Sequence, residues 1–322
     1  MELPPSLRHA VDHALEGVST AQLAAATQAL SQRYRKEVRD GRMHLSDTLA
    51  AQAYIATRMP ATYAAIHASL AAAAQRLQDF APASLLDVGA GPGTVLWAAQ
   101  SVWPELQSAK LVEASASIRA VGQQLAAASG LQRIDWKDAD IRRGVSNASP
   151  ADLVTLAYVL DELEPAERGK LVDALWTAVR GLLVIVEPGT TAGWRRILDA
   201  RAQLIAAGAH IIAPCPHALG CPIAEPDWCH FSARVARSRV HRVAKGGEVP
   251  WEDEKFAYLI ASRTPVQVSP ARVLSPPQSA SGRVQLKLCK PDGTAATRLV
   301  TRREGETFKQ ARRADWGDAF EG

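Results

Sequence analysis

Cysteine is scarce in this chain, since only four occur among its 322 residues. So few cysteines exclude a disulfide-rich secreted scaffold and are typical of a protein from a reducing compartment. Long apolar runs are also lacking, because no stretch approaches the roughly 18 to 20 residues that a membrane-spanning helix needs. The first residues, MELPPSLRHAVDHALEG, contain two prolines, Glu2 and Asp12, unlike a secretory signal or a transit peptide. We therefore expect no membrane association and a location in the bacterial cytoplasm.

A strong excess of one charge is absent as well, since 37 lysines and arginines stand against 33 acidic residues, a net charge of +4. The basic residues are nevertheless concentrated in three blocks. These are residues 33–42, residues 234–245 and a tail with Arg302, Arg303, Lys309, Arg312 and Arg313. Such blocks suit the phosphate backbone of a nucleic acid, although solvated faces of ordinary helices and strands give the same pattern.

The middle of the chain contains four short apolar runs that end in polar or glycine-rich residues. They are residues 84–88, 109–114, 151–158 and 181–187, and alanine-rich stretches of helical character separate them. Buried parallel strands that alternate with helices give this rhythm. The sequence therefore predicts an α/β fold with a doubly wound sheet.

The chain divides into three parts by composition. Residues 1–80 are rich in strong helix formers and predict an N-terminal helical region. Residues 81–265 would form the α/β domain, with a cysteine-rich insertion at residues 210–250. After a connector rich in proline and serine, residues 266–322 contain two strand-like runs and predict a C-terminal β extension that carries the fourth cysteine.

A glycine-rich loop, LLDVGAGPGTVLW, follows directly from the first apolar run. Gly89, Gly91 and Gly93 would allow a tight turn and would let a ligand lie against bare backbone, whose N–H groups point toward it at the start of the next helix. The dinucleotide-binding pattern G-x-G-x-x-G is not met, because position 94 is threonine. A tight turn without a ligand is the alternative.

The D-x-G-x-G-x-G spacing that begins at Asp87 resembles motif I of class I S-adenosylmethionine-dependent methyltransferases. The resemblance implies a Rossmann-like methyltransferase sheet with S-adenosylmethionine as the cofactor and Asp87 near its methionine end. It also implies that Glu113, the acid at the end of the second run, accepts hydrogen bonds from the ribose hydroxyls, and that Asp138 lies near the adenine.

The group that would act on a methyl acceptor is less well marked. The third run ends in LAYVLDELEP, which lacks both the Asp-Pro-Pro-Tyr of amine-methylating enzymes and the cysteine of cytosine C5 enzymes. Asp161 and Glu162 would act as a general base or orient a substrate, unless they cap the following helix. Glu187 ends the last run at the same edge of the sheet, where ligands of open α/β sheets bind. These three acids are the catalytic candidates.

The cysteines are clustered in sequence, with three inside one short stretch and the fourth 60 residues later. They are Cys215, Cys221, Cys229 and Cys289. Structural zinc sites usually use cysteine pairs only two to four residues apart. Four thiolates from an irregular loop and a distant strand are chemically suited to a 4Fe-4S cluster. A zinc site that includes His217 or His230, or a set of unrelated buried thiols, remains an alternative.

Three segments, APCPHALGCPIAEPDWCHF, WEDEKFAYLIASR and LKLCKPDGT…RRADWGD, resemble the mitochondrial small-ribosomal-subunit methyltransferase-like family and its bacterial relatives. The likeness runs from about residue 54 to the end of the chain. It implies that the four cysteines hold a 4Fe-4S cluster and that small-subunit ribosomal RNA, together with small-subunit proteins, is the partner. Trp251 stands where a tyrosine is expected, which keeps an aromatic side chain.

One hypothesis and two alternatives follow. The hypothesis is a methyltransferase-like protein that binds S-adenosylmethionine and a structural 4Fe-4S cluster and acts on small-subunit ribosomal RNA in ribosome assembly and translation. The first alternative is a non-catalytic RNA-binding assembly factor, and the second is a small-molecule methyltransferase with a structural zinc. Whether methyl transfer is retained is left open by the sequence.

Overall fold

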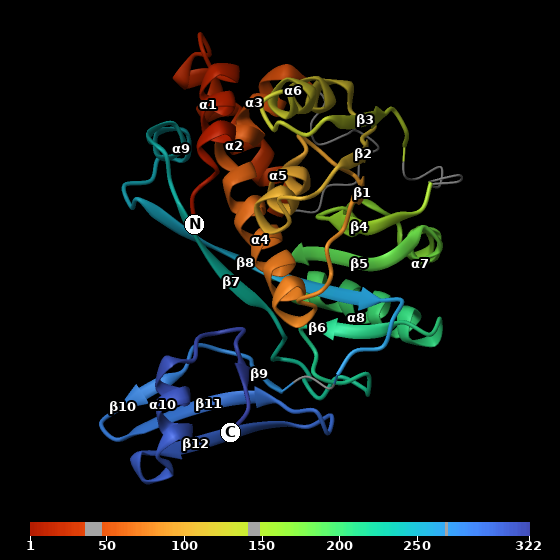
Figure 1. Cartoon of the computed structure of the whole chain (residues 1–322). Helices are drawn as coiled ribbons and strands as arrows, with labels where there is room; N and C mark the ends of the chain where they lie inside the picture. Colours follow the sequence, from red (N-terminus) through yellow and green to blue (C-terminus); the bar gives the residue numbers. More distant parts are fainter. Residues whose placement is uncertain (36–46, 141–148, 268–269) are drawn as a thin grey trace.

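A computed structural model describes residues 1–35, 47–140, 149–267 and 270–322, and its central feature is an eight-stranded mixed sheet (Figure 1). The strands are β1 (Ser84–Val88), β2 (Ser108–Val112), β3 (Arg133–Lys137), β4 (Ala151–Ala157), β5 (Val179–Pro188), β6 (His210–Ala213), β7 (Phe231–Ala236) and β8 (Trp251–Ser262). Their order is β3-β2-β1-β4-β5-β8-β6, with β7 also paired to β8. Strands β1 to β5 are parallel, and β8 runs antiparallel to β5, β6 and β7.

The inner strands are apolar because both of their faces are covered. In β5, residues 182–187 are all buried, and alternate side chains enter the cores on the two faces. At the sheet edge, β3 has the sequence RIDWK, and only its alternate residues are partly buried. The expected doubly wound α/β sheet is therefore confirmed.

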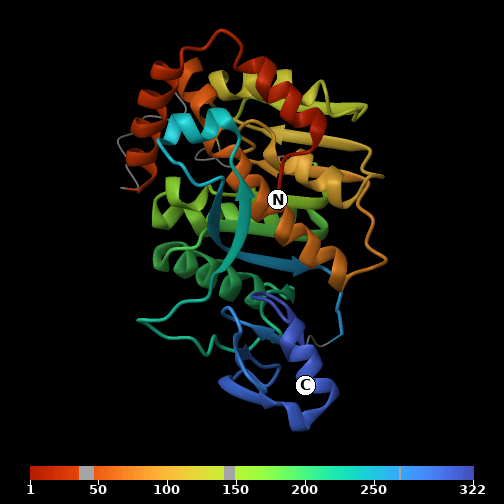
Figure 2. The ribbon, with the colours of Figure 1, turned by 90° about the vertical axis from the view of Figure 1, so that its left-hand side faces the viewer.

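Helices cover both faces of this sheet and form a three-layer structure (Figures 1 and 2). One face is covered by α1 (Pro5–Ala14), α3 (Thr48–Thr57), α4 (Met59–Arg76), α5 (Thr94–Val102) and α6 (Ala116–Ala126). The opposite face is covered by α7 (Pro165–Thr177) and α8 (Thr191–Ala206). Further out, α2 (Thr20–Arg35) packs against α3 and against α9 (Arg239–Lys245). Helix α8 packs against β8, and both elements line the pocket that holds the cysteines.

A second, antiparallel sheet follows at the C-terminus, with the order β10-β11-β9-β13 and with β12 paired to β11. Its elements are β9 (Ala271–Val273), β10 (Gln278–Ala280), β11 (Arg283–Cys289), β12 (Ala295–Thr301), the 3-10 turn η3 (Arg302–Glu304), α10 (Glu306–Arg313) and β13 (Ala319–Phe320). Leu286, Val300 and Phe308 contribute to a hydrophobic core of its own. The boundaries proposed for the three parts of the chain remain predictions.

The cysteine-rich stretch is an excursion from one edge of β8. On the edge opposite β5, Ala213 of β6 pairs with Ile260, and Phe231 of β7 pairs with Phe256. The chain therefore leaves and rejoins the same edge four positions apart. Residues 214–230, here called the cysteine loop, project from this edge toward the second sheet (Figure 1).

None of the helices in the described ranges combines the length and hydrophobicity needed to cross a lipid bilayer.

Candidate cofactor and cysteine sites

The glycine-rich loop lies at the carboxyl end of β1, where Gly89, Gly91 and Gly93 have φ values of 72°, 53° and 78°. The amide of Gly89 donates to Val112 O over 2.9 Å, which fixes the loop to the end of β2. A Cβ added to Gly89 would lie 2.4 Å from Val159 Cγ2, whereas one added to Gly91 would meet no described atom within 4 Å. The open side of the loop, at Gly91, has room for a ligand against the backbone.

Asp87 lies beneath this loop and is only 1% exposed. Thr155 Oγ1 donates to its Oδ1 over 2.7 Å, while its Oδ2 has no hydrogen-bond partner among the described residues. Burial raises the pKa of Asp87 to about 7, the Thr155 hydrogen bond opposes this rise, and the charge of Glu113 adds to it. A buried acceptor without a donor among the described residues is compatible with the methionine end of S-adenosylmethionine, which the resemblance implies lies near Asp87.

Glu113 follows β2 and Asp138 follows β3, and Arg119 donates hydrogen bonds to the backbone carbonyl of Glu113 and to the carboxylate of Asp138. Glu113 accepts hydrogen bonds of 2.8 Å from Gly91 N and Ser115 N, and burial raises the pKa of this carboxyl. Asp138 pairs with Arg119 Nη2 over 2.8 Å and stays largely exposed. Each Glu113 oxygen has a second lone pair, so bonding to ribose hydroxyls is compatible with these contacts.

The catalytic candidates differ in exposure, since Asp161 and Glu187 are buried and Glu162 is exposed. Asp161 and Glu162 form the 3-10 turn η2 (Leu160–Glu162), and α7 is capped instead by Glu164 in a capping box with Glu167. The interpretation of Asp161 and Glu162 as caps of that helix is therefore wrong, because the chain continues for two more residues before the helix begins.

Glu187 is fully buried and accepts hydrogen bonds from Arg196 Nε over 2.7 Å and Leu160 N over 3.1 Å. Burial and the charge of Asp161 raise the pKa of Glu187 to about 8, and Arg196 opposes this rise. The structure thus brings Glu187 and Asp161 together but fixes the Glu187 carboxylate inside the protein. Glu187 was expected to line the site, but it forms a buried ion pair with Arg196 instead.

Three residues at the same edge of the sheet had no signal in the sequence. Tyr158 follows β4 with φ of 60°, a left-handed conformation that costs a non-glycine residue about 1–2 kcal/mol. Its hydroxyl donates to Glu254 Oε1 over 3.1 Å, and Arg58 Nη2 lies 3.3 Å from the same oxygen. Burial, followed by the charge of Glu254, raises the pKa of Tyr158 well above its usual value. Their association depends on contacts between distant segments, which no local pattern indicates.

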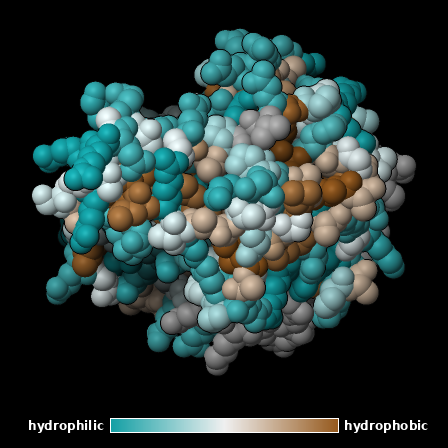
Figure 3. Space-filling view, turned by 90° about the horizontal axis from the view of Figure 1, so that it is seen from below, coloured by the Kyte–Doolittle hydropathy of each residue, from teal (hydrophilic) through white to brown (hydrophobic). Residues whose placement is uncertain are grey.

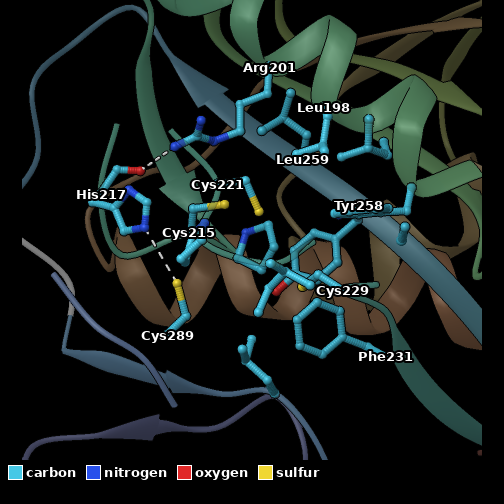
Figure 4. Close-up of a pocket in the computed structure, with 17 residues that line it drawn as sticks. Leu198, Arg201, Cys215, His217, Cys221, Cys229, Phe231, Tyr258, Leu259 and Cys289 are labelled. Carbon is cyan, nitrogen blue, oxygen red and sulfur yellow. Dashed lines mark hydrogen bonds between the residues drawn. The ribbon is translucent and has the colours of Figure 1, made fainter. Parts of the chain in front are cut away.

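All four cysteines line one pocket, as Figure 4 shows. The pocket encloses about 540 Å³ of empty space, part of it open to solvent. Three thiols come from the cysteine loop, and the fourth, Cys289, comes from the end of β11 in the second sheet. Apolar side chains of α8 and β8, including Trp194, Ile197 and Leu259, form much of the remaining wall. The pocket therefore joins the two sheets.

Burial raises the pKa of the Cys215 thiol and raises that of Cys229 well above its usual value. Burial also raises the pKa of Cys289 to about 12, with a further contribution from neighbouring thiols. The Sγ atom of Cys289 lies 3.4 Å from His217 Nε2. No group of three or more His, Cys, Asp or Glu side chains in the described ranges is close enough to bind a single metal ion. The thiols face a common space without meeting at one point.

Several contacts fix the cysteine loop to its surroundings. Ion pairs connect Glu225 to Arg195 of α8 and Asp227 to Lys287 of β11. The loop residue His230 stacks on Trp228, with ring centroids 4.9 Å apart, and meets Trp316 edge-on at the same distance. Because His230 is held between two aromatic rings, it does not take part in the lining of the pocket.

The basic blocks differ in how far their charges are already neutralised. In block 234–245, Arg234 pairs with Asp253, and both Arg237 and Lys245 pair with Glu252. In the tail, four exposed arginines have no ion pair among the described residues: Arg302, Arg303, Arg312 and Arg313. Most of block 33–42 lies outside the described residues.

Comparison with known protein families shows to which family the chain is related. The profile described as "Mitochondrial small ribosomal subunit Rsm22" matches residues 48–321. The chain belongs to this family.

Two relatives illustrate the range of the family. The chain is 30% identical over 284 residues to "Ribosome assembly protein METTL17, mitochondrial" from Homo sapiens, with 82% of this chain and 61% of that protein covered. It is 26% identical over 320 residues to "Rsm22-cox11 tandem protein 2, mitochondrial" from Schizosaccharomyces pombe, with 83% and 42% covered. The chain thus spans less than two thirds of the length of either relative.

Among solved structures, magnesium protoporphyrin IX methyltransferase from Synechocystis PCC 6803 with bound SAM is similar with a TM-score of 0.43 and 15% identity. The match covers 73% of this chain and 91% of that chain.

The relatives contradict the expected bacterial cytoplasmic location, because both are named as mitochondrial proteins. The sequence argument failed for a physical reason. Low cysteine use indicates a reducing environment, but more than one cellular compartment is reducing. The lack of a recognisable targeting pattern in the first residues does not identify a location.

Replacing Asp87 with asparagine should change how stability depends on pH. Because the folded-state pKa is raised above the unfolded value, this group's contribution to the free energy of unfolding is present below about pH 4 and is lost as the pH rises through about 7. Asp87→Asn should remove this loss, about 4 kcal/mol, and raise the melting temperature at neutral pH. Thermal unfolding across this pH range measures the effect. The exposed control Asp135→Asn should leave the pH profile unchanged, and equal profiles for wild type and Asp87→Asn would contradict the expectation.

Proposed function

We propose that this protein is a small-ribosomal-subunit assembly factor of the Rsm22 family that binds S-adenosylmethionine and a cysteine-held 4Fe-4S cluster, and that it contacts small-subunit ribosomal RNA. The observation that carries the proposal is the convergence of all four cysteines, three from the cysteine loop and one from the second sheet, on one pocket. Family membership and the names of the relatives support the ribosomal role.

The arrangement of the thiols favours a cluster over zinc. A zinc ion binds its sulfur ligands at about 2.3 Å, so four thiolates around it would lie close together. In a cluster each thiolate binds a different iron, which keeps the sulfurs further apart. The described cysteines surround a pocket without forming a single-ion site. This spacing, together with the softness of the ligands, supports the 4Fe-4S proposal.

Iron and acid-labile sulfide analysis of protein purified without oxygen tests the cluster directly. We expect about four of each per chain, and we expect Cys221→Ser to lose most of both, because each thiolate binds one iron. The control His210→Gln should keep its iron, since that side chain is exposed at the start of β6. One zinc per chain without sulfide would contradict the cluster.

The RNA contact is assigned to the second sheet and α10. The arginines without ion pairs, at positions 302, 303, 312 and 313, lie there, while much of block 234–245 is neutralised by Glu252 and Asp253. Seen from below, the molecule presents a mainly hydrophilic face with smaller apolar patches (Figure 3). Unpaired cations on such a face suit phosphate groups.

Loss of two of these cations should weaken RNA binding in a salt-dependent way. We expect Arg312→Ala combined with Arg313→Ala to lower the affinity for small-subunit ribosomal RNA about tenfold and to reduce the slope of log affinity against log salt by about 1 to 2. Arg234→Ala is the control, because Asp253 already neutralises that guanidinium. Equal losses in both proteins, or an unchanged slope, would count against this surface.

Methyl transfer depends on the open side of the glycine-rich loop. Bound S-adenosylmethionine would supply an electrophilic methyl group, while the residues of the chain position the cofactor through the loop, Asp87, Glu113 and Asp138. Two of the three candidate acids are unavailable as a general base, because Glu187 is fixed by Arg196 and Asp161 is buried, whereas Glu162 is exposed. This observation favours the second candidate function, a non-catalytic assembly factor.

Tritium transfer from labelled S-adenosylmethionine to small ribosomal subunits from cells without the protein separates the two candidates. If the protein is an enzyme, Gly91→Ala should abolish transfer. The Cβ of the new alanine would occupy the open side of the glycine-rich loop, where the cofactor is proposed to bind. Gly208→Ala is the matched control, since it also has positive φ and open space but lies at the end of α8. Cofactor binding by wild type without transfer would establish the non-catalytic candidate.

A further inference from the structure

Two buried arginines lie beside the cysteine pocket. Arg201, from α8, is 5% exposed and lines the pocket, and Arg272, from β9, is 4% exposed and pairs in register with Cys289 across the strands. Both guanidinium charges act on the thiols of Cys215 and Cys289. Figure 4 shows Arg201 at the upper side of the group of sulfur atoms.

The contacts of these guanidinium groups are with backbone carbonyls. Arg201 Nη2 donates to His217 O and Leu219 O over 2.7 and 2.8 Å. Arg272 Nε donates to Pro214 O over 3.1 Å, and its Nη1 donates to Gly317 O over 2.6 Å. Within the described ranges neither arginine forms an ion pair, and Arg201 Nε and Arg272 Nη2 have no hydrogen-bond partner.

Buried cations without a counter-charge are unusual. The free energy lost when a charged group leaves water is much larger than the free energy gained from its hydrogen bonds to carbonyl oxygens. The same protein contains a compensated example, since the buried Arg196 is paired with Glu187. Among the described residues, the thiols are the groups at the cysteine pocket that both arginines act on and that could carry negative charge. Four thiolates around an oxidised 4Fe-4S core of charge +2 leave a net charge of −2. Two arginines would balance it.

We propose that Arg201 and Arg272 are the counter-charges of the cluster and that they set its reduction potential. This inference rests on the cluster proposed above. Reduction adds one electron to the iron core and changes no ligand bond, so the site becomes more negative by one unit. Nearby cations stabilise the reduced state more than the oxidised state, and their loss makes reduction harder.

A redox titration of the intact protein, with dithionite as the electron donor and the visible spectrum as the signal, tests this role. We expect Arg201→Gln and Arg272→Gln each to lower the equilibrium constant for one-electron reduction about tenfold, equal to about 59 mV toward more negative potential. Arg201→Lys should keep the wild-type potential because it keeps the charge. It should share the lower melting temperature of Arg201→Gln, because both lose the geometry that bonds two carbonyls.

Arg283→Gln is the matched control, since it removes the same charge from an exposed position on β11, the strand that carries Cys289. A wild-type potential in both glutamine variants, or an equal shift in Arg201→Lys, would overturn the inference. If a variant does not retain iron, loss in Arg201→Gln with retention in Arg201→Lys supports the charge role, and loss in both contradicts it. Wild-type protein without iron and sulfide would instead remove the cluster itself.

Discussion

The pairing of β6 and β7 with one edge of β8 is the constraint on which the cysteine site depends. Because the two strands rejoin β8 only four positions apart, the residues between them must leave the sheet as a loop. The direction of that loop is fixed by Asp227 and Trp228, which contact Lys287 and Gly189. Three cysteines are thereby held at the place where Cys289 arrives from the second sheet.

The two buried arginine environments of this protein differ in kind. Arg196 and Glu187 neutralise one another inside the main sheet layer, so that pair is complete without a ligand. Within the described ranges the N–H···O hydrogen bonds of Arg201 and Arg272 all go to carbonyl oxygens, so negative charge in the pocket, as proposed, would balance them. Charge balance thus separates a structural ion pair from a site that fits an anionic occupant.

Much of the main sheet could be predicted from the sequence, because its inner strands are buried on both faces and their apolar runs are continuous. Residues 84–88 match β1, and residues 181–187 lie inside β5. The edge strands β3, β6 and β7 were missed, since each is short or half-exposed and forms only through pairing with distant residues. Asp87 and Glu113 could be placed because strand ends are recognisable in a sequence. Arg201, Arg272 and Tyr158 could not, since a single arginine or tyrosine has no local signature of its partners.

The fourth cysteine lies 60 residues beyond the third. At a synthesis rate of roughly 5 to 20 residues per second, it leaves the ribosome several seconds after the others. During that interval β8, Arg272 and β11 are made in turn, so the three thiols can be held beside Arg201 only after β8 is available to pair with β6 and β7. The pocket therefore forms after the main sheet. It is complete only when the second sheet, which carries Cys289, has also been made.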